Sequence, residues 1–144
     1  MSRRARAAAS AQEIRHPFTS LRFAVGIERL GTFGAVEVVL PESRVVTTGC
    51  RRSIVHSALT LRRGLSSATE WYDWWFDSRR RRAGSARRVT LELLDAGGEP
   101  RIRWFFPDSI PRAYSVSPLS ALREAVVLES LELAVGDFVL QKLQ

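Results

Sequence analysis

Three tryptophans lie within five residues near the middle of the chain, and they constrain the fold more than any other feature. Trp71, Trp74, Trp75 and Ser78 fall at positions i, i+3, i+4 and i+7, which is the spacing of one stripe along an α-helix. A helix with this much aromatic surface on one side is not stable alone in water, because its apolar stripe must be covered. We therefore expect the helix to lie on a sheet built from the segments that flank it.

The ends of this helix are also marked in the sequence. Ser67 is expected to cap its N-terminus, and Glu70 three residues later completes a capping box, in which each side chain accepts a hydrogen bond from a backbone N–H. At the other end, the run Arg79–Arg82 places cations at the negative end of the helix dipole, and Gly84 follows. The pattern predicts a helix over about residues 67–81.

Apolar side chains at every second position predict strands on both sides of the helix. Residues 57–62 alternate before it, and residues 89–94 and 102–106 alternate after it, joined by a turn at 95–99. The core between helix and sheet is expected to contain Trp71, Trp74, Trp75 and Trp104.

Other segments complete the predicted sheets. Residues 21–27 and 126–135 alternate in the same way, and residues 110–117 are expected to form a separate strand beyond a break at Pro107. About seven strands and one helix predict a mainly β (α+β) fold. We expect a two-sheet β-sandwich or flattened barrel with one flanking amphipathic helix.

Short motifs follow one another in a fixed order through this part of the chain. They are LTLRRGL at 59–65, WYDWW at 71–75, VTLELLD at 89–95, GEP at 98–100, RWFF at 103–106 and ESLELA at 129–134. In this order, and over roughly residues 16–136, the sequence resembles the T4-like phage tail tube protein family. That family also supplies the inner tubes of phage-like contractile injection systems.

The resemblance implies a structural protein, an inner-tube subunit that assembles into stacked hexameric rings. Such a tube would be enclosed by a sheath protein, would stand on a baseplate hub or spike, and would hold cargo or DNA in its lumen. Ring formation suits a β-rich protomer, because pairing with identical neighbours removes its unpaired strand edges. The family usually has a longer, glycine-bearing segment where this chain has only residues 41–53. A specialised ring at the tube end, either the initiator at the baseplate or a terminal cap, is therefore an alternative role.

The net charge of +7 is carried almost entirely by arginine and permits a second alternative, a small basic nucleic-acid-binding domain. DNA-binding proteins usually place arginines along a helix face or in a recognisable module, and neither pattern is present. The arginines selected as candidate assembly contacts are Arg44, Arg51, Arg52, Arg79, Arg80, Arg81 and Arg82.

The length of 144 residues suits one domain with a core of its own. Residues 1–14, rich in Ala, Arg and Ser, predict a flexible basic N-terminal arm, which leaves 15–144 as a single tail-tube-like domain. No apolar run reaches the about 20 residues that cross a bilayer, and the N-terminus lacks an apolar signal-peptide core. We therefore expect no membrane insertion, and assembly in the cytoplasm into a phage tail or phage-like injection particle.

The sequence predicts no catalytic, cofactor or metal site, and hence no enzyme. His16 and His56 have no further ligands at zinc-binding spacing. Cys50 precedes His56, but no partner motif for a thiol–imidazole pair surrounds them. The helix carboxylates are expected to have structural rather than catalytic roles, because Glu70 caps the helix and Asp77 pairs with an arginine.

Overall fold

The chain is built mainly of β-strands. The computed structural model describes residues 22–80 and 84–143, in which there are ten strands and one helix. The elements are β1 (Phe23–Ile27), β2 (Gly31–Phe33), β3 (Glu37–Val39), β4 (Ser43–Thr48), β5 (Arg51–His56), β6 (Leu59–Gly64), α2 (Glu70–Ser78), β7 (Arg87–Leu94), β8 (Pro100–Val116), β9 (Leu128–Val135) and β10 (Val139–Lys142). The predicted mainly β, sandwich-like fold with one helix is confirmed, and the ten strands exceed the predicted number of about seven.

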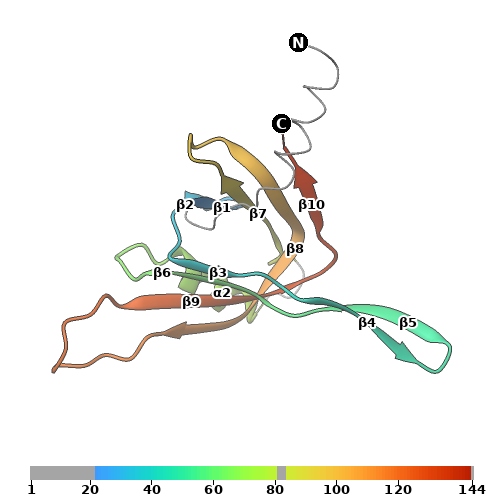
Figure 1. Cartoon of the computed structure of the whole chain (residues 1–144). Helices are drawn as coiled ribbons and strands as arrows, with labels where there is room; N and C mark the ends of the chain where they lie inside the picture. The colour runs from blue at the N-terminus through green and yellow to red at the C-terminus, as the bar shows by residue number, and fades with distance from the viewer. Residues whose placement is uncertain (1–21, 81–83, 144) are drawn as a thin grey trace, which may run out of the picture.

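Eight strands form one sheet that folds back on itself. Its order is β2-β1-β7-β8-β9-β6-β3, and β10 pairs with β8 beside this path. The 17-residue strand β8 belongs to both halves, because its first part pairs with β7 and β10 and its second part, from Ser109 onward, pairs with β9. The halves thus form two layers that meet along β8, and the separate β4–β5 hairpin projects away from them (Figure 1).

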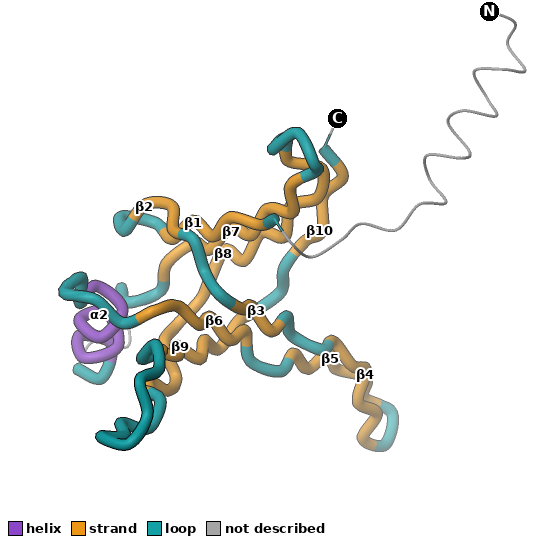
Figure 2. Tube along the Cα trace, turned by 60° about the vertical axis from the view of Figure 1, so that its left-hand side comes forward, coloured by secondary structure: helices purple, strands orange, loops and turns teal. Residues whose placement is uncertain are grey.

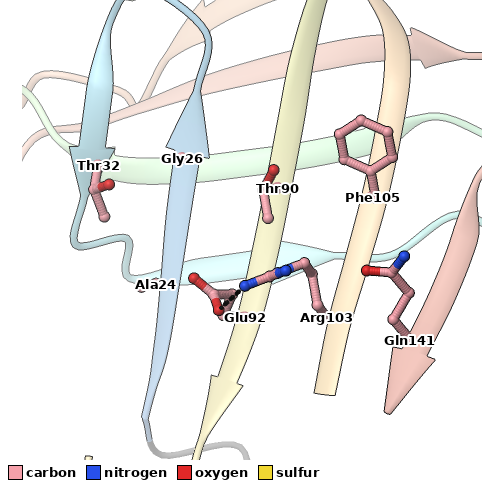
Figure 3. Close-up of a pocket in the computed structure, with 8 residues that line it drawn as sticks. All are labelled: Ala24, Gly26, Thr32, Thr90, Glu92, Arg103, Phe105 and Gln141. Carbon is pink, nitrogen blue, oxygen red and sulfur yellow. Dashed lines mark hydrogen bonds and ion pairs between the residues drawn. The ribbon is translucent and has the colours of Figure 1, made fainter. Parts of the chain in front are cut away.

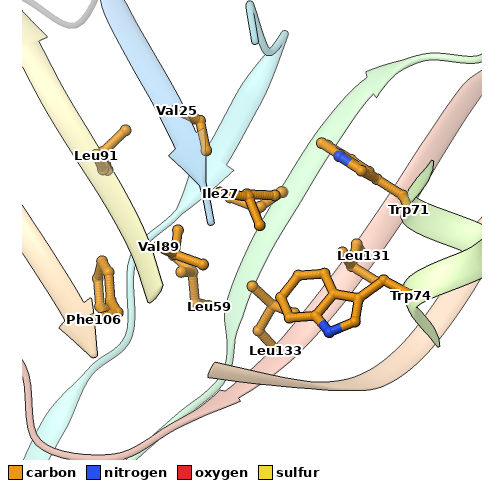
Figure 4. Close-up of a cluster of buried hydrophobic side chains, with 11 residues drawn as sticks. Val25, Ile27, Leu59, Trp71, Trp74, Val89, Leu91, Phe106, Leu131 and Leu133 are labelled. Carbon is orange, nitrogen blue, oxygen red and sulfur yellow. The ribbon is translucent and has the colours of Figure 1, made fainter. Parts of the chain in front are cut away.

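The core lies between the two layers. Val25 on β1 is paired with Leu91 on β7, and Leu61 on β6 is paired with Leu131 on β9, so each layer turns its alternate apolar side chains inward. Figure 4 shows apolar side chains of both layers, among them Val25, Leu91 and Leu131, converging with the two helix tryptophans. The buried apolar residues are Val25, Ile27, Leu59, Leu61, Trp71, Trp74, Val89, Leu91, Phe106, Leu131 and Leu133.

The predicted break at Pro107 is wrong, because β8 runs through both Pro107 and Pro111. The pairing register with β7 shifts between Arg87 and Val89, opposite the segment that holds Pro107. The register with β9 shifts between Pro111 and Ala113. A proline is tolerated at such bulges, since the ladder hydrogen bond that it cannot donate is already missing there.

The helix is shorter than predicted. It spans Glu70–Ser78 rather than residues 67–81, its N-cap is Thr69, and no side chain caps it. The predicted capping box is therefore not formed: Ser67 lies outside the helix, and Glu70 accepts a hydrogen bond from Arg63 instead. The predicted basic last turn is also wrong, because the helix ends before the arginine run and Arg79 is its C-cap.

Several predictions fall outside the described residues, namely those for the 1–14 arm, His16, Arg81 and Arg82. Within the described ranges, no helix is long and apolar enough to span a membrane.

Candidate functional site

Several strand edges have no partner in the described part of the chain. β2 and β3 stand at the two ends of the sheet, paired only with β1 and β6. β7 pairs with β8 as far as Ser109, so residues 110–116 of β8 have β9 on one side only. β10 pairs with β8 alone. Free edges of this kind pair readily with strands of another chain.

The β4–β5 hairpin exposes apolar side chains far from the core. Val45 is paired with Ile54 across the hairpin, and these residues are 53% and 63% exposed. Val55 is half exposed as well. A two-stranded hairpin has little stability of its own in water, and an exposed apolar patch of this kind is typical of a surface that contacts another molecule.

The base of the hairpin is joined to the body through His56. Its Nδ1 lies 2.9 Å from Ser43 Oγ, and its Nε2 lies 3.0 Å from Asp137 Oδ1 in the segment between β9 and β10. The ring also packs against Phe138, at 5.1 Å between centroids. His56 therefore connects the hairpin to the body through side-chain contacts. Cys50 lies in the turn at the opposite end of the hairpin.

The loop between β8 and β9 is a second exposed apolar surface. Leu119 is 79% exposed, Leu122 99% and Val126 76%. This loop and the β4–β5 hairpin extend from the body in different directions (Figures 1 and 2). Two such surfaces at separate ends of one subunit suit head-to-tail contact between copies.

The candidate arginines that the structure describes form two groups rather than one patch. Arg44, Arg51 and Arg52 lie on the hairpin, where only Arg44 has a carboxylate partner in the described residues, Glu42 at 2.8 Å. The hydrogen bond and charge of Glu42 raise the pKa of the Arg44 guanidinium.

Arg79 and Arg80 follow α2, on another side of the body (Figure 2). The guanidinium of Arg79 lies 4.2 Å from the centre of the Phe76 ring and 5.1 Å from that of Trp75. Both groups are exposed, so both are available to partners.

The four tryptophans differ in burial. Trp71 and Trp74 are buried, and Trp74 Nε1 donates to the carbonyl oxygen of Ser85 at 2.7 Å. Trp75 and Trp104 are partly buried against the core. The helix is thus held against the sheet by Trp71 and Trp74, its inner stripe, while Trp75 at the edge of that stripe is partly exposed.

A buried arginine, Arg63, joins β6 to β9 and also contacts α2, and sequence reasoning missed it. Arg63 Nε donates to Glu129, which is 1% exposed, and Arg63 Nη2 donates to Glu70 at 3.3 Å. The guanidinium also lies 4.2 Å from the centre of the Trp71 ring. Burial, followed by the hydrogen bond to Glu129, raises the pKa of Tyr114 to about 12, so its hydroxyl stays a donor to that carboxylate. The only sign of this ion pair in the sequence was that Arg63 and Glu129 each take an inward-facing position in the alternation of a strand.

The outer face of the β1–β7–β8 layer holds an open hollow of about 510 Å³ (Figure 3). It is lined by Ala24, Gly26, Thr32, Thr90, Glu92, Arg103, Phe105 and Gln141. Its charges neutralise each other, since Arg103 donates to Glu92 at 3.0 Å. Among the residues described, no three His, Cys, Asp or Glu side chains are grouped to hold a metal ion.

The comparisons with known proteins agree with this geometry. The family model described as "T4-like virus tail tube protein gp19" matches residues 44–139. No curated protein matches the chain by sequence.

Solved structures of injection particles share the fold. A chain of the anti-feeding prophage (AFP) baseplate, 6-fold symmetrised, is 20% identical with a TM-score of 0.70, covering 88% of this chain and 97% of that chain. A chain of the sheath–tube complex of the extracellular contractile injection system PVC is 17% identical with a TM-score of 0.71, covering 93% and 97%. A chain of the anti-feeding prophage tube-terminating cap is 13% identical with a TM-score of 0.70, covering 90% and 93%.

At these identities the structural likeness establishes the fold, whereas the family model, which covers most of the chain, establishes the family. The chain therefore belongs to the T4-like virus tail tube protein family and is a structural tube subunit.

Proposed function

We propose that the chain builds stacked six-membered rings that form the inner tube of a contractile injection particle. The observation that carries this proposal is the set of strand edges left bare on β2, β3, β8 and β10. Closing a ring would pair such edges between subunits, and the protruding hairpin and the β8–β9 loop would supply contacts between successive rings. The 6-fold symmetrised baseplate among the similar structures supports six subunits per ring.

The proposed mechanism is mechanical rather than chemical. A rigid tube is driven forward when a surrounding sheath shortens, and cargo or DNA passes through its bore. The similarity to a sheath–tube complex and to a baseplate supports the sheath and the baseplate hub as partners. The tube would assemble in the cytoplasm.

Negative-stain electron microscopy of the purified chain tests this proposal. We expect rings, or tubes made of stacked rings, and averaging of end-on views to give six subunits. Dispersed monomers that persist after the purified sheath and baseplate proteins are added would contradict it.

A terminal ring is a second candidate, supported by the short segment 41–53 and by the likeness to a tube-terminating cap. Copy number decides between the two roles. A main-shaft subunit occurs in many rings of the reconstructed particle, whereas an initiator or cap occurs in six copies only.

A further inference from the structure

The β4–β5 hairpin has few polar contacts with the body. It forms a sheet of its own, separate from the eight-stranded sheet. Among the hydrogen bonds and ion pairs of the described residues, only one joins residues 42–57 to the rest of the chain, from His56 Nε2 to Asp137 Oδ1 at 3.0 Å. The ring contact between His56 and Phe138 lies beside it. We call these two contacts of His56 the latch.

The backbone ladder is interrupted where the hairpin leaves the body. The ladder between β3 and β6 ends at the pair Val39–Thr60, and the hairpin's own ladder starts only with β4 and β5. Figure 1 shows β3 and β6 leading into the hairpin at this place. Pro41 lies in the gap and has no N–H to donate, so it cannot extend either ladder. Residues 40–41 and residue 58 are therefore the positions at which the chain can bend.

The base of the hairpin is cross-linked beyond this gap. The backbone N–H of Glu42 donates to Ser57 Oγ at 2.7 Å, and the backbone N–H of Ser57 donates to the carbonyl oxygen of Glu42 at 2.9 Å. These bonds hold the two strands together at their base. A bend at the gap would therefore move the hairpin as one unit and leave its internal pairing intact.

The latch meets a fixed part of the body. The Phe138 ring lies 4.8 Å from the ring of Phe106, which is fully buried in the core. The backbone N–H of Gly136 donates to the carbonyl oxygen of Asp108 on β8 at 3.3 Å. Asp137 is thus held between two anchored neighbours, although its own side chain is exposed.

Both ring nitrogens of His56 are engaged, which fixes the direction of the ring. The carboxylate of Asp137 can only accept, so Nε2 carries a proton and donates to it. In the neutral ring, Nδ1 then accepts from the hydroxyl of Ser43, the residue directly opposite on β4. One side chain therefore contacts both strands of the hairpin and the body.

We propose that the β4–β5 hairpin is a hinged arm of the free subunit, and that the His56 latch sets the direction in which the arm projects. The hinge is formed by residues 40–41 and 58. Holding the arm in one direction lowers the entropic cost of any contact that its exposed Val45 and Ile54 make. The inference goes beyond ring assembly and does not depend on it.

Pulsed electron–electron double resonance between two spin labels tests the proposal on the full chain. One label is attached to Cys50, the single cysteine, which is exposed in the hairpin turn. The other is attached to Glu99→Cys in the exposed turn between β7 and β8. The sample is the single-subunit fraction from size-exclusion chromatography. We expect a narrow distance distribution for the latched chain, and we expect His56→Ala to widen it about twofold.

Asp137→Ala removes the hydrogen bond from the body side. The Asp137 side chain is 94% exposed, so its loss should not disturb the fold. We expect a smaller widening than for His56→Ala, because the ring contact with Phe138 remains, and no further widening when the two substitutions are combined. The matched control is Arg52→Ala. This residue is exposed on β5, has no hydrogen bond or ion pair to any part of the body that the structure describes, and should leave the width unchanged.

Three outcomes would overturn the proposal. A distribution for His56→Ala as narrow as that of the latched chain would mean that the connecting segments fix the hairpin by themselves. A latched chain as broad as His56→Ala would mean that the contact does not restrain the arm. Equal widening by Arg52→Ala would mean that the effect is not specific to the latch. Circular dichroism establishes that each variant is folded. Absence of rings in the microscope does not affect a distance within one subunit, so the failure of one proposal is distinguishable from that of the other.

Discussion

The two-layer body and the β4–β5 hairpin are both antiparallel β-structure, yet they differ in what covers their side chains. In the body, Val25 and Leu91 are paired on one face and buried by the opposite layer. In the hairpin, Val45 and Ile54 are paired in the same way and are mostly exposed. The comparison teaches that alternation in the sequence marks one face of a strand, and that the chain itself buries that face in the body but leaves it exposed in the hairpin.

The largest expected effect comes from the body. Trp74→Ala removes a buried ring and its hydrogen bond to Ser85, and we expect the free energy of unfolding to fall by about 4 kcal/mol. Urea unfolding followed by circular dichroism measures the change. Tyr72→Ala on the exposed side of the same helix is the control, with an expected loss below about 1 kcal/mol. Similar losses for the two variants would show that the helix is not fixed by its inner stripe.

The second prediction concerns the buried charges. Glu129→Gln leaves Arg63 with Glu70, which is about one-third exposed, as its carboxylate partner, and we expect a loss of about 3 kcal/mol in the same urea assay. Glu37→Gln breaks the exposed pair with Arg62 and is expected to cost less than about 1 kcal/mol. If the two substitutions cost the same, burial would not be what makes the Arg63–Glu129 pair stabilising.

The third prediction is a pH dependence that is confined to the body. The folded pKa of Tyr114, about 12, is above the ordinary value of 10.0, so the stabilisation is complete below pH 10 and is lost as the pH rises toward 12. Unfolding midpoints measured from pH 9 to 12 should therefore decline for the native chain. The unfolding midpoint of Tyr114→Phe, which cannot ionise, should decline less steeply over that window. Identical slopes for the two proteins would show that ionisation of Tyr114 does not cause the decline.

The smallest effect on the folded subunit is expected in the hairpin. Val45→Thr/Ile54→Thr keeps the β-branched shape, and because these side chains bury little within the chain, the free energy of unfolding should change by less than about 0.5 kcal/mol. Assembly should respond instead, with fewer stacked rings in electron micrographs at equal protein concentration. Normal stacking by this variant would mean that another surface joins the rings.

The sequence predicted the parts of the fold that depend on local periodicity. The alternation in β1, β6, β7 and β9 survives folding, because each of these strands has one face in the core. The ends of α2 could not be predicted in the same way. Arg63 engages Glu70, so the capping role assigned to that carboxylate gives way to a tertiary contact.

The passage of β8 through two prolines was also not predictable from local rules. Pro107 and Pro111 both lie where the pairing register shifts, and a register is a property of two strands that are distant in the sequence. The role of the candidate arginines as assembly contacts stays a prediction. Arg79 was selected for the charge of its run, whereas its stacking on Phe76 became visible only in three dimensions.

The continuous strand β8 has a consequence for a subunit that, in the proposed mechanism, would transmit force. Its backbone is hydrogen-bonded to β7 and β10 in one layer and to β9 in the other. A load applied to one layer therefore reaches the other through covalent bonds and paired ladders, and not through side-chain contacts alone. Sliding the layers past each other would require these ladders to be broken, which makes the subunit stiff along the direction of that strand.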